Sequence, residues 1–458
     1  MNMDVNDSLL DLIGNTPMMK LKSLDTGPCD LYVKLELNNP GGSIKDRVGL
    51  SIIEEAENSG ELKPGGTIIE ATAGNTGIGL ALIAALKGYK IILVIPDKMS
   101  REKILHLEGL GAEIILTRSD VPEGHPEYYQ DMARKLAQET PGAFLANQFG
   151  NPANPTAHRT TTAPEIWEQM QGNIDAVVAG VGSGGTLTGL AEFFKSKDPS
   201  ICMVAADPEG SIISDAVLKG EYNYDGGSWL VEGVGEDFIP DTFEVSLMDD
   251  AETVSDKEAF EVLQIILKEE GILGGSSTGT LVAAAAKWCR KQKEHKNVVT
   301  FICDTGNKYL SKAFNKAWLQ DNNLLDLKTH GDLRDLINRR ADQGEMISVN
   351  ETDSLLVAYN RMRASDVSQI PVMKDNKLVG ILDEEDLLFA VSKDQSSFSN
   401  NVSDYMMDHL DTLQFDASKD ELLSILTEGK VAIIFDGETF IGFVTKVDLI
   451  NYYRNKFK

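Results

Sequence analysis

The sequence predicts an α/β protein with open, largely parallel sheets, followed by a small C-terminal module. From about residue 65, short β-branched runs such as "GTIIEA" and "KIILVIP" alternate with amphipathic stretches such as "TGIGLALIAALKG". This alternation is typical of βαβ units, and it returns in "IDAVVAGVGSGGTLTGLAEFFK" and "VVTFICDTG". The polar stretch "LQDNNLLDLKTHGD" then indicates a boundary. We therefore expect one α/β domain over residues 1–325 and a linker over residues 326–343.

The tail contains an internal repeat, which reports its architecture directly. The segments "SLLVAYNRMRASDVSQIPVMKDNKLVGILDEEDLL" and "ELLSILTEGKVAIIFDGETFIGFVTKVDLI" both read as a helix, a strand, a turn, a second strand and an acidic helix start. Gly380 and Gly442 occupy matching places, as do Asp386 and Asp448. Each unit alone would leave an apolar face exposed, so we expect the two units to pack together. The units are predicted at residues 344–395 and 396–458.

Composition excludes several classes of function. The formal net charge of −28 would repel phosphate backbones and anionic lipids, so neither nucleic acid nor a membrane is expected as a partner. The N-terminal sequence lacks a basic stretch followed by a long apolar one, and we expect a cytoplasmic protein. The four cysteines are scattered without a CxxC motif and the six histidines form no ligand-spaced pair, which argues against a disulfide framework or a zinc site.

The stretch "NNPGGSIKDRVGL" places a lysine in the first turn of a predicted helix. Ser43 is a candidate N-cap, and Val48, Ile52 and Ala56 recur at helical spacing after it. Lys45 therefore lies at the positive end of the helix dipole, where a cation is least favoured. One interpretation is a solvated charged cluster. The other is a lysine that is held neutral or converted to an imine, because desolvation and a positive field both lower its pKa and make it a nucleophile.

Two further glycine-rich turns, "TAGNTG" at residues 72–77 and "GVGSGGT" at residues 180–186, follow predicted strands and open predicted helices. Such turns bind anions because glycines free the backbone N–H groups and the helix supplies partial positive charge. The second turn also fits G-x-G-x-x-G from Gly180 to Gly185, with Asp207 near the end of the next strand, so a nicotinamide dehydrogenase is an alternative. That alternative leaves the lysine stretch and the first turn without a role. Each turn taken alone could serve only chain reversal.

A lysine nucleophile together with phosphate-binding glycine turns suits a carbonyl cofactor that bears a phosphate, of which pyridoxal 5'-phosphate is the obvious case. A partner for the pyridine nitrogen is then needed, and Ser277 in "GILGGSSTGT" offers a hydroxyl in another small-residue turn before a helix. A serine there would hydrogen-bond a neutral pyridine, which makes the ring a weaker electron sink and favours β-elimination over transamination. A helix N-cap is the alternative role for Ser277.

Several motifs, in order along the chain, resemble those of the cysteine synthase and cystathionine β-synthase family: "IGNTPMMKL", "NPGGSIKDR", "EATAGNTGIGLALIAALKGY", "NPANPTAH", "GVGSGGTLTG", "EGVGEDFIP" and "EGILGGSSTG". They span residues 8 to about 320 of the chain. The resemblance implies a pyridoxal-phosphate dependent enzyme of fold type II, with two open sheets flanked by helices. The tail resembles a tandem pair of CBS domains, also called a Bateman module, and this combination favours cystathionine formation over cysteine formation.

The resemblance assigns roles to the residues that match the family's motifs. Lys45 matches the Schiff-base lysine, which also removes the substrate's α-proton and is the catalytic residue. Asn75 matches the residue that hydrogen-bonds the cofactor's phenolic oxygen, and Ser277 matches the partner of the pyridine nitrogen. The phosphate loop corresponds to Gly182, Ser183, Gly184, Gly185 and Thr186, and the residues that bind the substrate's carboxylate correspond to Thr72, Gly74, Thr76 and Gln148.

The reaction that the resemblance implies is a β-replacement. L-serine, or an activated serine, loses its β-substituent to leave an aminoacrylate, and L-homocysteine adds to give L-cystathionine. A cysteine synthase acting on O-acetyl-L-serine and sulfide is the alternative, and a catalytically idle scaffold is a third. Two departures bear on the choice: Glu236 stands where animal and yeast members have a tyrosine, and Ala73 stands where a serine is common. The N-terminus begins just before the catalytic motif, so no haem is expected.

In the tail, "GFVTKVDLI" resembles the nucleotide-binding pattern of CBS domains, and Thr445 and Asp448 match the residues that contact phosphate and ribose. The first repeat has Asp383 where the hydroxyl should be, which disfavours a phosphate. We therefore expect at most one adenosyl-type site. The alternative is a purely structural pair of domains that packs across a dimer. A homodimer or a higher homo-oligomer is expected in either case.

Overall fold

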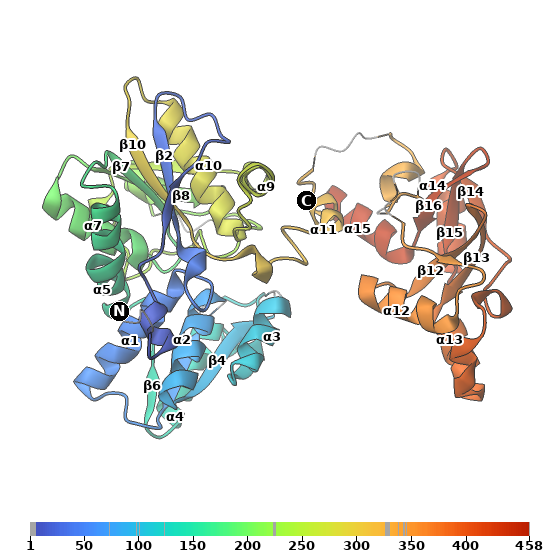
Figure 1. Ribbon diagram of the computed structural model, residues 1–458, viewed down its shortest axis with the longest axis horizontal. Coiled ribbons are helices and arrows are strands. Elements are labelled where there is room, and N and C mark those ends of the chain that lie inside the picture. The colour runs from blue at the N-terminus through green and yellow to red at the C-terminus, as the bar shows by residue number, and fades with distance from the viewer. Residues whose placement is uncertain are drawn as a thin grey trace, which may run out of the picture. The chain divides into compact units, whose positions relative to one another are not determined.

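The computed structural model of the protein describes residues 6–72, 74–97, 99, 101–122, 124–222, 226–325, 330–337, 339–341, 344 and 346–457. The chain forms two compact units, an N-terminal unit of residues Met1–Lys316 and a C-terminal unit of residues Ala317–Lys458 (Figure 1). Within the expected linker, residues 326–329, 338, 342 and 343 lie outside the described residues, and Leu333–Leu336 form the short helix η6.

The N-terminal unit contains two open sheets. A six-stranded sheet has the order β1-β2-β10-β7-β8-β9, and all its neighbouring strands are parallel except β1 and β2. A four-stranded sheet, β5-β4-β3-β6, is parallel throughout. The predicted architecture of parallel and mixed open sheets is therefore confirmed. The strands are β1 (Met18–Lys20), β2 (Asp30–Leu35), β3 (Thr67–Ala71), β4 (Lys90–Pro96), β5 (Glu113–Thr117), β6 (Ala143–Leu145), β7 (Ala176–Gly180), β8 (Cys202–Pro208), β9 (Asp250–Val254) and β10 (Asn297–Ile302).

Helices cover both faces of each sheet. Helices α7 and α10 lie on opposite sides of the six-stranded sheet (Figure 1), and α10 contacts most of its strands. The α-helices of this unit are α1 (Lys45–Ser59), α2 (Asn75–Lys87), α3 (Arg101–Gly109), α4 (Tyr129–Glu139), α5 (Ala153–Ala157), α6 (Ala163–Gln169), α7 (Gly185–Lys197), α8 (Ile213–Lys219), α9 (Asp256–Glu270) and α10 (Ser276–Arg290). Shorter helices are η1 (Leu9–Leu12), η2 (Glu36–Asn38), η4 (Val245–Leu247), η5 (Gly306–Lys308) and the π-helical turn η3 (His158–Thr162).

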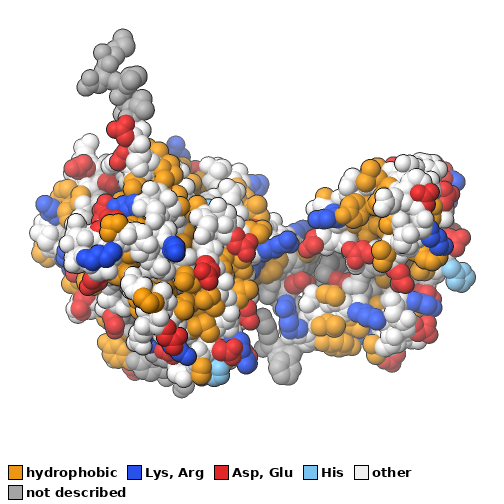
Figure 2. Space-filling view, turned by 90° about the horizontal axis from the view of Figure 1, so that it is seen from below, with side chains coloured by type: hydrophobic (Ala, Val, Ile, Leu, Met, Phe, Trp, Pro, Cys, Tyr) orange, Lys and Arg blue, Asp and Glu red, His pale blue; other side chains and the backbone are white. Residues whose placement is uncertain are grey.

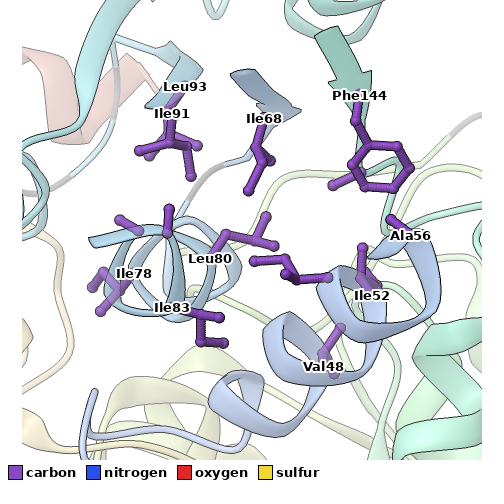
Figure 3. Close-up of a cluster of buried hydrophobic side chains, with 14 of the residues drawn as sticks. Val48, Ile52, Ala56, Ile68, Ile78, Leu80, Ile83, Ile91, Leu93 and Phe144 are labelled. Atoms are coloured by element: carbon purple, nitrogen blue, oxygen red, sulfur yellow. The ribbon is translucent and has the colours of Figure 1, made fainter. Parts of the chain in front are cut away.

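Helix α1 packs against α2 and one face of the four-stranded sheet through its periodic apolar positions. Val48, Ile52 and Ala56 belong to the same buried cluster as Ile68 of β3, and side chains of α2, β4 and β6 complete it (Figure 3). The next residue of β3, Ile69, belongs to a second cluster with residues of α4, because successive side chains of a strand point to opposite faces. Each fully buried aliphatic side chain contributes about 1.5–3 kcal/mol, so this packing anchors α1.

The first turn of α1 is held close to α2. A Cβ added at Gly79 of α2 would lie 2.7 Å from the carbonyl oxygen of Lys45. Helix α1 begins at Lys45 with Ile44 as its N-cap, so the predicted cap at Ser43 was one residue too early. Ser43 instead forms an isolated β-bridge with Asp304, and its Oγ accepts a hydrogen bond from the backbone N–H of Lys45 at 3.2 Å.

The C-terminal unit repeats one arrangement of strands and helices, which confirms the internal repeat. Its two three-stranded sheets have the orders β11-β12-β13 and β14-β15-β16. Gly380 lies opposite Val372, Gly442 lies opposite Ile434, and the strand register shifts just after each pair. The matched glycines therefore mark the same β-bulge in both repeats. The elements are α11 (Lys316–Asp321), β11 (Val349–Asn350), α12 (Leu355–Ser365), β12 (Gln369–Lys374), β13 (Lys377–Asp383), α13 (Glu384–Lys393), η8 (Gln395–Ser399), η9 (Val402–Asp404), β14 (Thr412–Gln414), α14 (Lys419–Thr427), β15 (Ala432–Asp436), β16 (Thr439–Val444) and α15 (Lys446–Phe457).

Charged side chains of both signs are interspersed on the face of the molecule in Figure 2. Among the described residues, no helix is both long and apolar enough to cross a membrane. The same part of the chain contains no group of three or more His, Cys, Asp or Glu side chains arranged to hold a metal ion.

Candidate active site

The candidate site residues gather where parallel strands of the sheets end. Strands β7 and β10 are parallel neighbours, so the segments that follow them leave the same edge of the six-stranded sheet. An isolated β-bridge joins Ser43 to Asp304, just beyond β10. The backbone N–H of Ile44 donates to the Cys303 carbonyl oxygen at 2.9 Å. These contacts fix the start of α1, and with it Lys45, at this edge.

Lys45 has the environment of a reactive amine. Burial lowers the pKa of the half-buried Lys45 amine, although the nearby carboxylates of Asp304 and Glu236 oppose that shift. Its neighbours Asp46 and Arg47 are only 0% and 3% exposed. A solvated charged cluster is therefore the wrong interpretation of "KDR". A lysine whose neutral form is more accessible can act as a nucleophile or as a general base.

Asn75, the first residue of α2, is connected to the end of β10. Its Nδ2 donates to Asp304 Oδ2 at 2.7 Å, and its Oδ1 accepts from Lys308 Nζ at 2.9 Å. The Tyr309 hydroxyl donates to the same Asp304 oxygen at 2.6 Å. Asp304 thereby links Asn75, beside the four-stranded sheet, to the segment that anchors α1. Sequence reasoning missed Asp304, Lys308 and Tyr309, whose signal is the polar run "CDTGNKY" directly after a buried strand.

The glycine turn after β7 is shaped by close packing. Gly184 is the N-cap of α7 and has a φ of 84°, which favours glycine. A Cβ at Gly182 would lie 2.8 Å from the Gly233 carbonyl oxygen, and a Cβ at Gly185 would lie 2.2 Å from Asn154 Oδ1. Larger residues would therefore push neighbouring segments away. The turn lies at the positive end of the α7 dipole, where anions bind favourably.

Two buried hydroxyls of this turn are held by the segment of residues 153–162. Asn154 Nδ2 donates to Ser183 Oγ at 2.9 Å, and His158 Nε2 lies 3.1 Å from Thr186 Oγ1. Burial lowers the pKa of His158 well below its ordinary value, so the ring is neutral at physiological pH. The sequence motif "NPANPTAH" predicted membership of the family, but it gave no role to Asn154 or His158.

Ser277 lies on the same edge as Lys45. It is the second residue of α10, whose N-cap is Gly275, so the N-cap interpretation of Ser277 is wrong. Its side chain is hydrogen-bonded to the Cys303 thiol, and burial raises the pKa of that thiol to about 12. The Ser277 hydroxyl therefore has a neutral thiol as its neighbour rather than a charge.

The predicted carboxylate-binding residues lie together at the ends of β3 and β6. Thr72 Oγ1 accepts from the backbone N–H of Gly74 at 3.2 Å. Thr76 Oγ1 donates to Gln148 Oε1 at 2.6 Å. The backbone N–H of Gln148 donates in turn to Glu70 Oε2 at 3.2 Å, and burial raises the pKa of Glu70 to about 8. The structure thus brings all four predicted residues into one hydroxyl-rich loop cluster supported by a buried carboxyl group.

The two departures from the family pattern have different outcomes. Glu236 is half-buried and close enough to Lys45 for its charge to act on that amine. Its backbone is fixed by Ser211 Oγ, which accepts from the Glu236 N–H and donates to the Glu236 carbonyl, both at 3.0 Å. Ala73 lies outside the described residues.

A second acidic residue of the same stretch, Glu232, joins elements of both sheets. It forms ion pairs with Lys103 of α3 at 2.6 Å and with Lys312 at 2.8 Å. The Lys103 amine also lies 4.4 Å from the centre of the Tyr309 ring. Sequence analysis did not single out these residues, because each one taken alone reads as a surface charge.

The dehydrogenase alternative requires an accessible acidic residue near the end of the next strand, and Asp207 is not accessible. Asp207 would have to bind a ribose in that fold, but it is only 1% exposed and its Oδ2 accepts from the backbone N–H of Ser214 at 2.8 Å. This contact ties Asp207 to the first turn of α8. The burial of Asp207 therefore argues against the dehydrogenase alternative.

In the C-terminal unit, Thr445 and Asp448 form the start of α15. Thr445 Oγ1 and the Thr445 backbone N–H both donate to Asp448 Oδ2, at 2.6 and 2.7 Å. In the first repeat, Asp383 and Asp386 form the corresponding capping box. The pair Thr445–Asp448 thus has the residue types of a nucleotide contact but also a complete structural role as a helix cap.

The chemistry of the N-terminal residues fits a phosphate-bearing carbonyl cofactor. Lys45 offers an amine for the carbonyl group, and Asn75 offers an amide N–H. The turn at the start of α7 offers buried hydroxyls and a helix N-terminus for the phosphate, and Ser277 offers a neutral hydroxyl for a ring nitrogen. Buried contacts of Asp304 and Cys303 connect three of these four groups.

Comparison with known proteins identifies the families to which the two parts of the chain belong. The family model described as pyridoxal-phosphate dependent enzyme matches residues 9–304, and the CBS domain model matches residues 333–393 and 402–455. The cystathionine beta-synthase of Dictyostelium discoideum is 36% identical over 467 residues, covering 98% of this chain and 92% of the relative. The cystathionine beta-synthase of Saccharomyces cerevisiae is 34% identical over 507 residues, covering 98% of both chains.

Solved structures resemble about two thirds of the chain. An O-acetylserine dependent cystathionine beta-synthase from Helicobacter pylori is 40% identical with a TM-score of 0.62, covering 68% of this chain and 99% of that chain. A hydrogen sulfide-producing enzyme from Fusobacterium nucleatum is 39% identical with a TM-score of 0.62, covering 67% of this chain and 100% of that chain. The chain therefore belongs to the pyridoxal-phosphate dependent enzymes of fold type II and carries a tandem pair of CBS domains in addition.

Proposed function

We propose that this protein condenses L-serine, or an activated L-serine, with L-homocysteine to form L-cystathionine. The observation that carries the proposal is the convergence of Lys45, Asn75 and Ser277 on one sheet edge through Asp304 and Cys303. The similarity to cystathionine beta-synthases along almost the whole chain, CBS domains included, supports this substrate pair.

Pyridoxal phosphate supplies an electron sink that weakens the bonds at the Cα and Cβ atoms of an amino acid. Lys45 would take the α-proton onto its amine nitrogen, and its lowered pKa keeps that nitrogen available as a base. The same proton can later be returned to Cα. Glu236 would favour the protonated amine that exists between these steps, because its carboxylate lies near Lys45.

The chain's other residues would bind and orient. Thr72, Gly74, Thr76 and Gln148 would hold the substrate's carboxylate near the N-terminus of α2, where the helix dipole favours an anion. The phosphate would lie on the turn of Gly182, Ser183, Gly184, Gly185 and Thr186. Asn154 donates to Ser183 Oγ, so the Ser183 hydroxyl keeps its own proton for an external acceptor.

The Ser277 hydroxyl would contact the ring nitrogen without protonating it. A neutral ring nitrogen withdraws electrons less strongly than a protonated one, which favours loss of the β-substituent over transamination. The Cys303 thiol, whose pKa burial raises to about 12, is hydrogen-bonded to Ser277 and supports this arrangement, because a neutral neighbour adds no charge beside the hydroxyl.

A cysteine synthase acting on O-acetyl-L-serine and sulfide is the second candidate. The description of the Helicobacter pylori structure names O-acetylserine dependence, which is the donor that this candidate needs, although that enzyme is described as a cystathionine beta-synthase. Both candidates use the same residues and differ in the leaving group and the thiol.

The C-terminal unit would bind one adenosyl-type ligand, at Thr445 and Asp448 of the second repeat. The first repeat would bind none, because Asp383 presents a carboxylate where a phosphate would lie. We further propose a homodimer or higher homo-oligomer located in the cytoplasm.

The experiment that tests the proposal is product analysis of the purified holo-protein. L-serine and O-acetyl-L-serine are each combined with L-homocysteine or sulfide, with Lys45→Ala as the matched control. We expect rapid cystathionine formation from L-homocysteine and loss of all products in the control. Turnover of O-acetyl-L-serine with sulfide alone would instead support the second candidate.

A further inference from the structure

Lys308 is a buried lysine that the reaction as described does not use. It ends the short helix η5 after Asp304, and it is only 4% exposed. Its Nζ donates to the carbonyl oxygens of Gly41 at 2.9 Å and Gly42 at 3.2 Å, and to Asn75 Oδ1 at 2.9 Å. An ammonium group has three hydrogens to donate, so these three acceptors match its capacity.

The contact with Lys308 decides which way the Asn75 amide points. The Lys308 amine donates in all three of its contacts, and Asp304 Oδ2 accepts in its contacts with Asn75 and Tyr309. Asn75 Oδ1 lies 2.9 Å from Lys308 Nζ, and Asn75 Nδ2 lies 2.7 Å from Asp304 Oδ2. An amide rotated by half a turn would place hydrogens against the ammonium and oxygen against the carboxylate. The observed orientation directs the Asn75 nitrogen to Asp304 and the Tyr309 hydroxyl, and it directs the Asn75 oxygen to Lys308.

The other two acceptors of Lys308 belong to the loop that leads into Lys45. Gly42 has a φ of 72°, and a Cβ there would lie 2.9 Å from Thr305 Cγ2 and 3.6 Å from Lys308 Nζ. The backbone N–H of Gly41 donates to Asp46 Oδ2 at 2.5 Å. Lys308 therefore ties the loop before Lys45 to Asn75 with a single side chain.

We propose that Lys308 is a positioning residue of this enzyme, which fixes the orientation of the Asn75 amide and its placement relative to Lys45. The proposal rests on the proposed role of Asn75 as the partner of the cofactor's ring oxygen. Lys308 acts through Asn75 and the glycine loop rather than on the substrate. A basic residue at this place sets how strongly the ring oxygen is held and therefore the colour of the bound cofactor.

The test compares visible absorption spectra and cofactor dissociation for purified holo-proteins. The variants are Lys308→Met, Lys308→Arg, Asn75→Ala and the double variant Lys308→Met with Asn75→Ala. Lys34→Met is the matched control, because Lys34 is also a fully buried lysine with three acceptors, namely the Thr16 carbonyl, Glu165 and Gln169. Far-UV circular dichroism establishes that each variant is folded, and Lys308→Gln replaces Lys308→Met if the latter does not fold.

We expect Lys308→Met to shift the long-wavelength absorption band in the same direction as Asn75→Ala and to weaken cofactor retention roughly tenfold, which is the loss expected for one charge-assisted hydrogen bond. The double variant should shift no further than Asn75→Ala alone, and Lys308→Arg should restore the normal band. Lys34→Met should keep it. Lys308→Gln, which lacks the charge, should shift the band in the same direction as Lys308→Met.

Three results would overturn the inference, and they are distinguishable. A normal spectrum in Lys308→Met or Lys308→Gln, with a shifted one in Asn75→Ala, would refute the role of Lys308 and leave the proposed function intact. A normal spectrum in Asn75→Ala would refute the assigned contact of Asn75, and the inference with it. A shift in Lys34→Met as large as that in Lys308→Met would also refute it, because loss of any buried lysine would then suffice.

Discussion

Replacing Arg47 with methionine tests whether a buried ion network holds the start of α1. Arg47 donates from Nε and Nη2 to the two carboxylate oxygens of Glu36, at 2.8 and 2.9 Å. It also donates from Nη1 and Nη2 to Glu165, at 2.6 and 2.7 Å. The Arg47 side chain is 2% exposed and the Glu36 side chain 0%. Although burial opposes its charge, Glu36 and Glu165 raise the pKa of Arg47 above its ordinary value.

The expected loss of stability follows from the buried Glu36 charge, which would no longer have its cationic partner. Without Arg47, the hydrogen bonds of Glu36 within the described part of the chain come from neutral donors, Thr16 Oγ1 at 2.6 Å and Asn39 Nδ2 at 2.8 Å. Breaking a buried ion pair by removing one partner costs about 3–5 kcal/mol. We expect Arg47→Met to lower the free energy of unfolding by that amount. The double variant Arg47→Met with Glu36→Gln should cost about 1–3 kcal/mol less than the single variant, because no buried charge is left unpaired.

The assay is urea unfolding of the holo-protein followed by tryptophan fluorescence, with Trp167 and Trp288 reporting on the N-terminal unit. Lys87→Met is the control, since the ion pair of Lys87 with Glu57 is partly exposed, at 22% and 28%, and should contribute at most about 1 kcal/mol. The reasoning is refuted if Arg47→Met costs less than about 1 kcal/mol, or if the double variant costs as much as Arg47→Met alone.

Three further predictions concern other parts of the two units. Although burial opposes its charge, Arg47 and Lys34 lower the pKa of Glu165 from 4.5 to about 2, so Glu165→Gln should cost roughly 3 kcal/mol at neutral pH. A carboxyl group whose pKa is lowered in the folded state stabilises the protein at pH values above the ordinary pKa of that group. The stability difference between the original protein and Glu165→Gln should therefore shrink in thermal unfolding as the pH falls from 4.5 towards 2, and a constant difference would contradict the prediction. Gly79→Ala should separate α1 from α2, lower the free energy of unfolding by about 1–3 kcal/mol and reduce the cofactor content measured by absorbance. Gly109→Ala is the control, because there is open space around Gly109, and it should have neither effect. Equal effects of the two variants would refute the close packing of α1 against α2. Thr445→Val should weaken binding of an adenosyl nucleotide in calorimetry roughly tenfold by removing a hydroxyl contact, and Asp383→Asn should not weaken it; unchanged binding in Thr445→Val would exclude that site.

Much of the fold could be predicted because hydrophobic periodicity reports it directly. The alternating runs between residues 65 and 117 became β3, α2, β4, α3 and β5 in that order. The repeat in the tail was visible because both halves carry a glycine at the same β-bulge, Gly380 and Gly442. Such features depend on residues close together in sequence, which a linear pattern can record.

Helix starts were less predictable. Ser43 has the residue type of an N-cap, but its pairing with Asp304 extends the backbone there and moves the helix start to Lys45. Ser277 also looked like a cap, yet α10 begins one residue before it. In both cases a tertiary contact or a neighbouring residue decided between local alternatives that have similar energy.

The supporting residues of the candidate site could not be predicted from a single sequence. Lys308 contacts residues more than two hundred positions away, and Asn154 of α5 reaches Ser183 in the turn before α7. A lysine in a polar stretch and an asparagine beside prolines have no local pattern that separates a buried partner from a solvated side chain. Their roles follow from the three-dimensional structure, which brings the ends of the strands and the segments after them close together.

The most direct test of the central claim is to find which residue carries the cofactor. The holo-protein is reduced with borohydride, digested and analysed by peptide mass spectrometry, with untreated protein as the control. The account predicts a single pyridoxyl group on the peptide that contains Lys45, and none on the peptides that contain Lys103 or Lys308. A pyridoxyl group on another lysine, or on none, would contradict it.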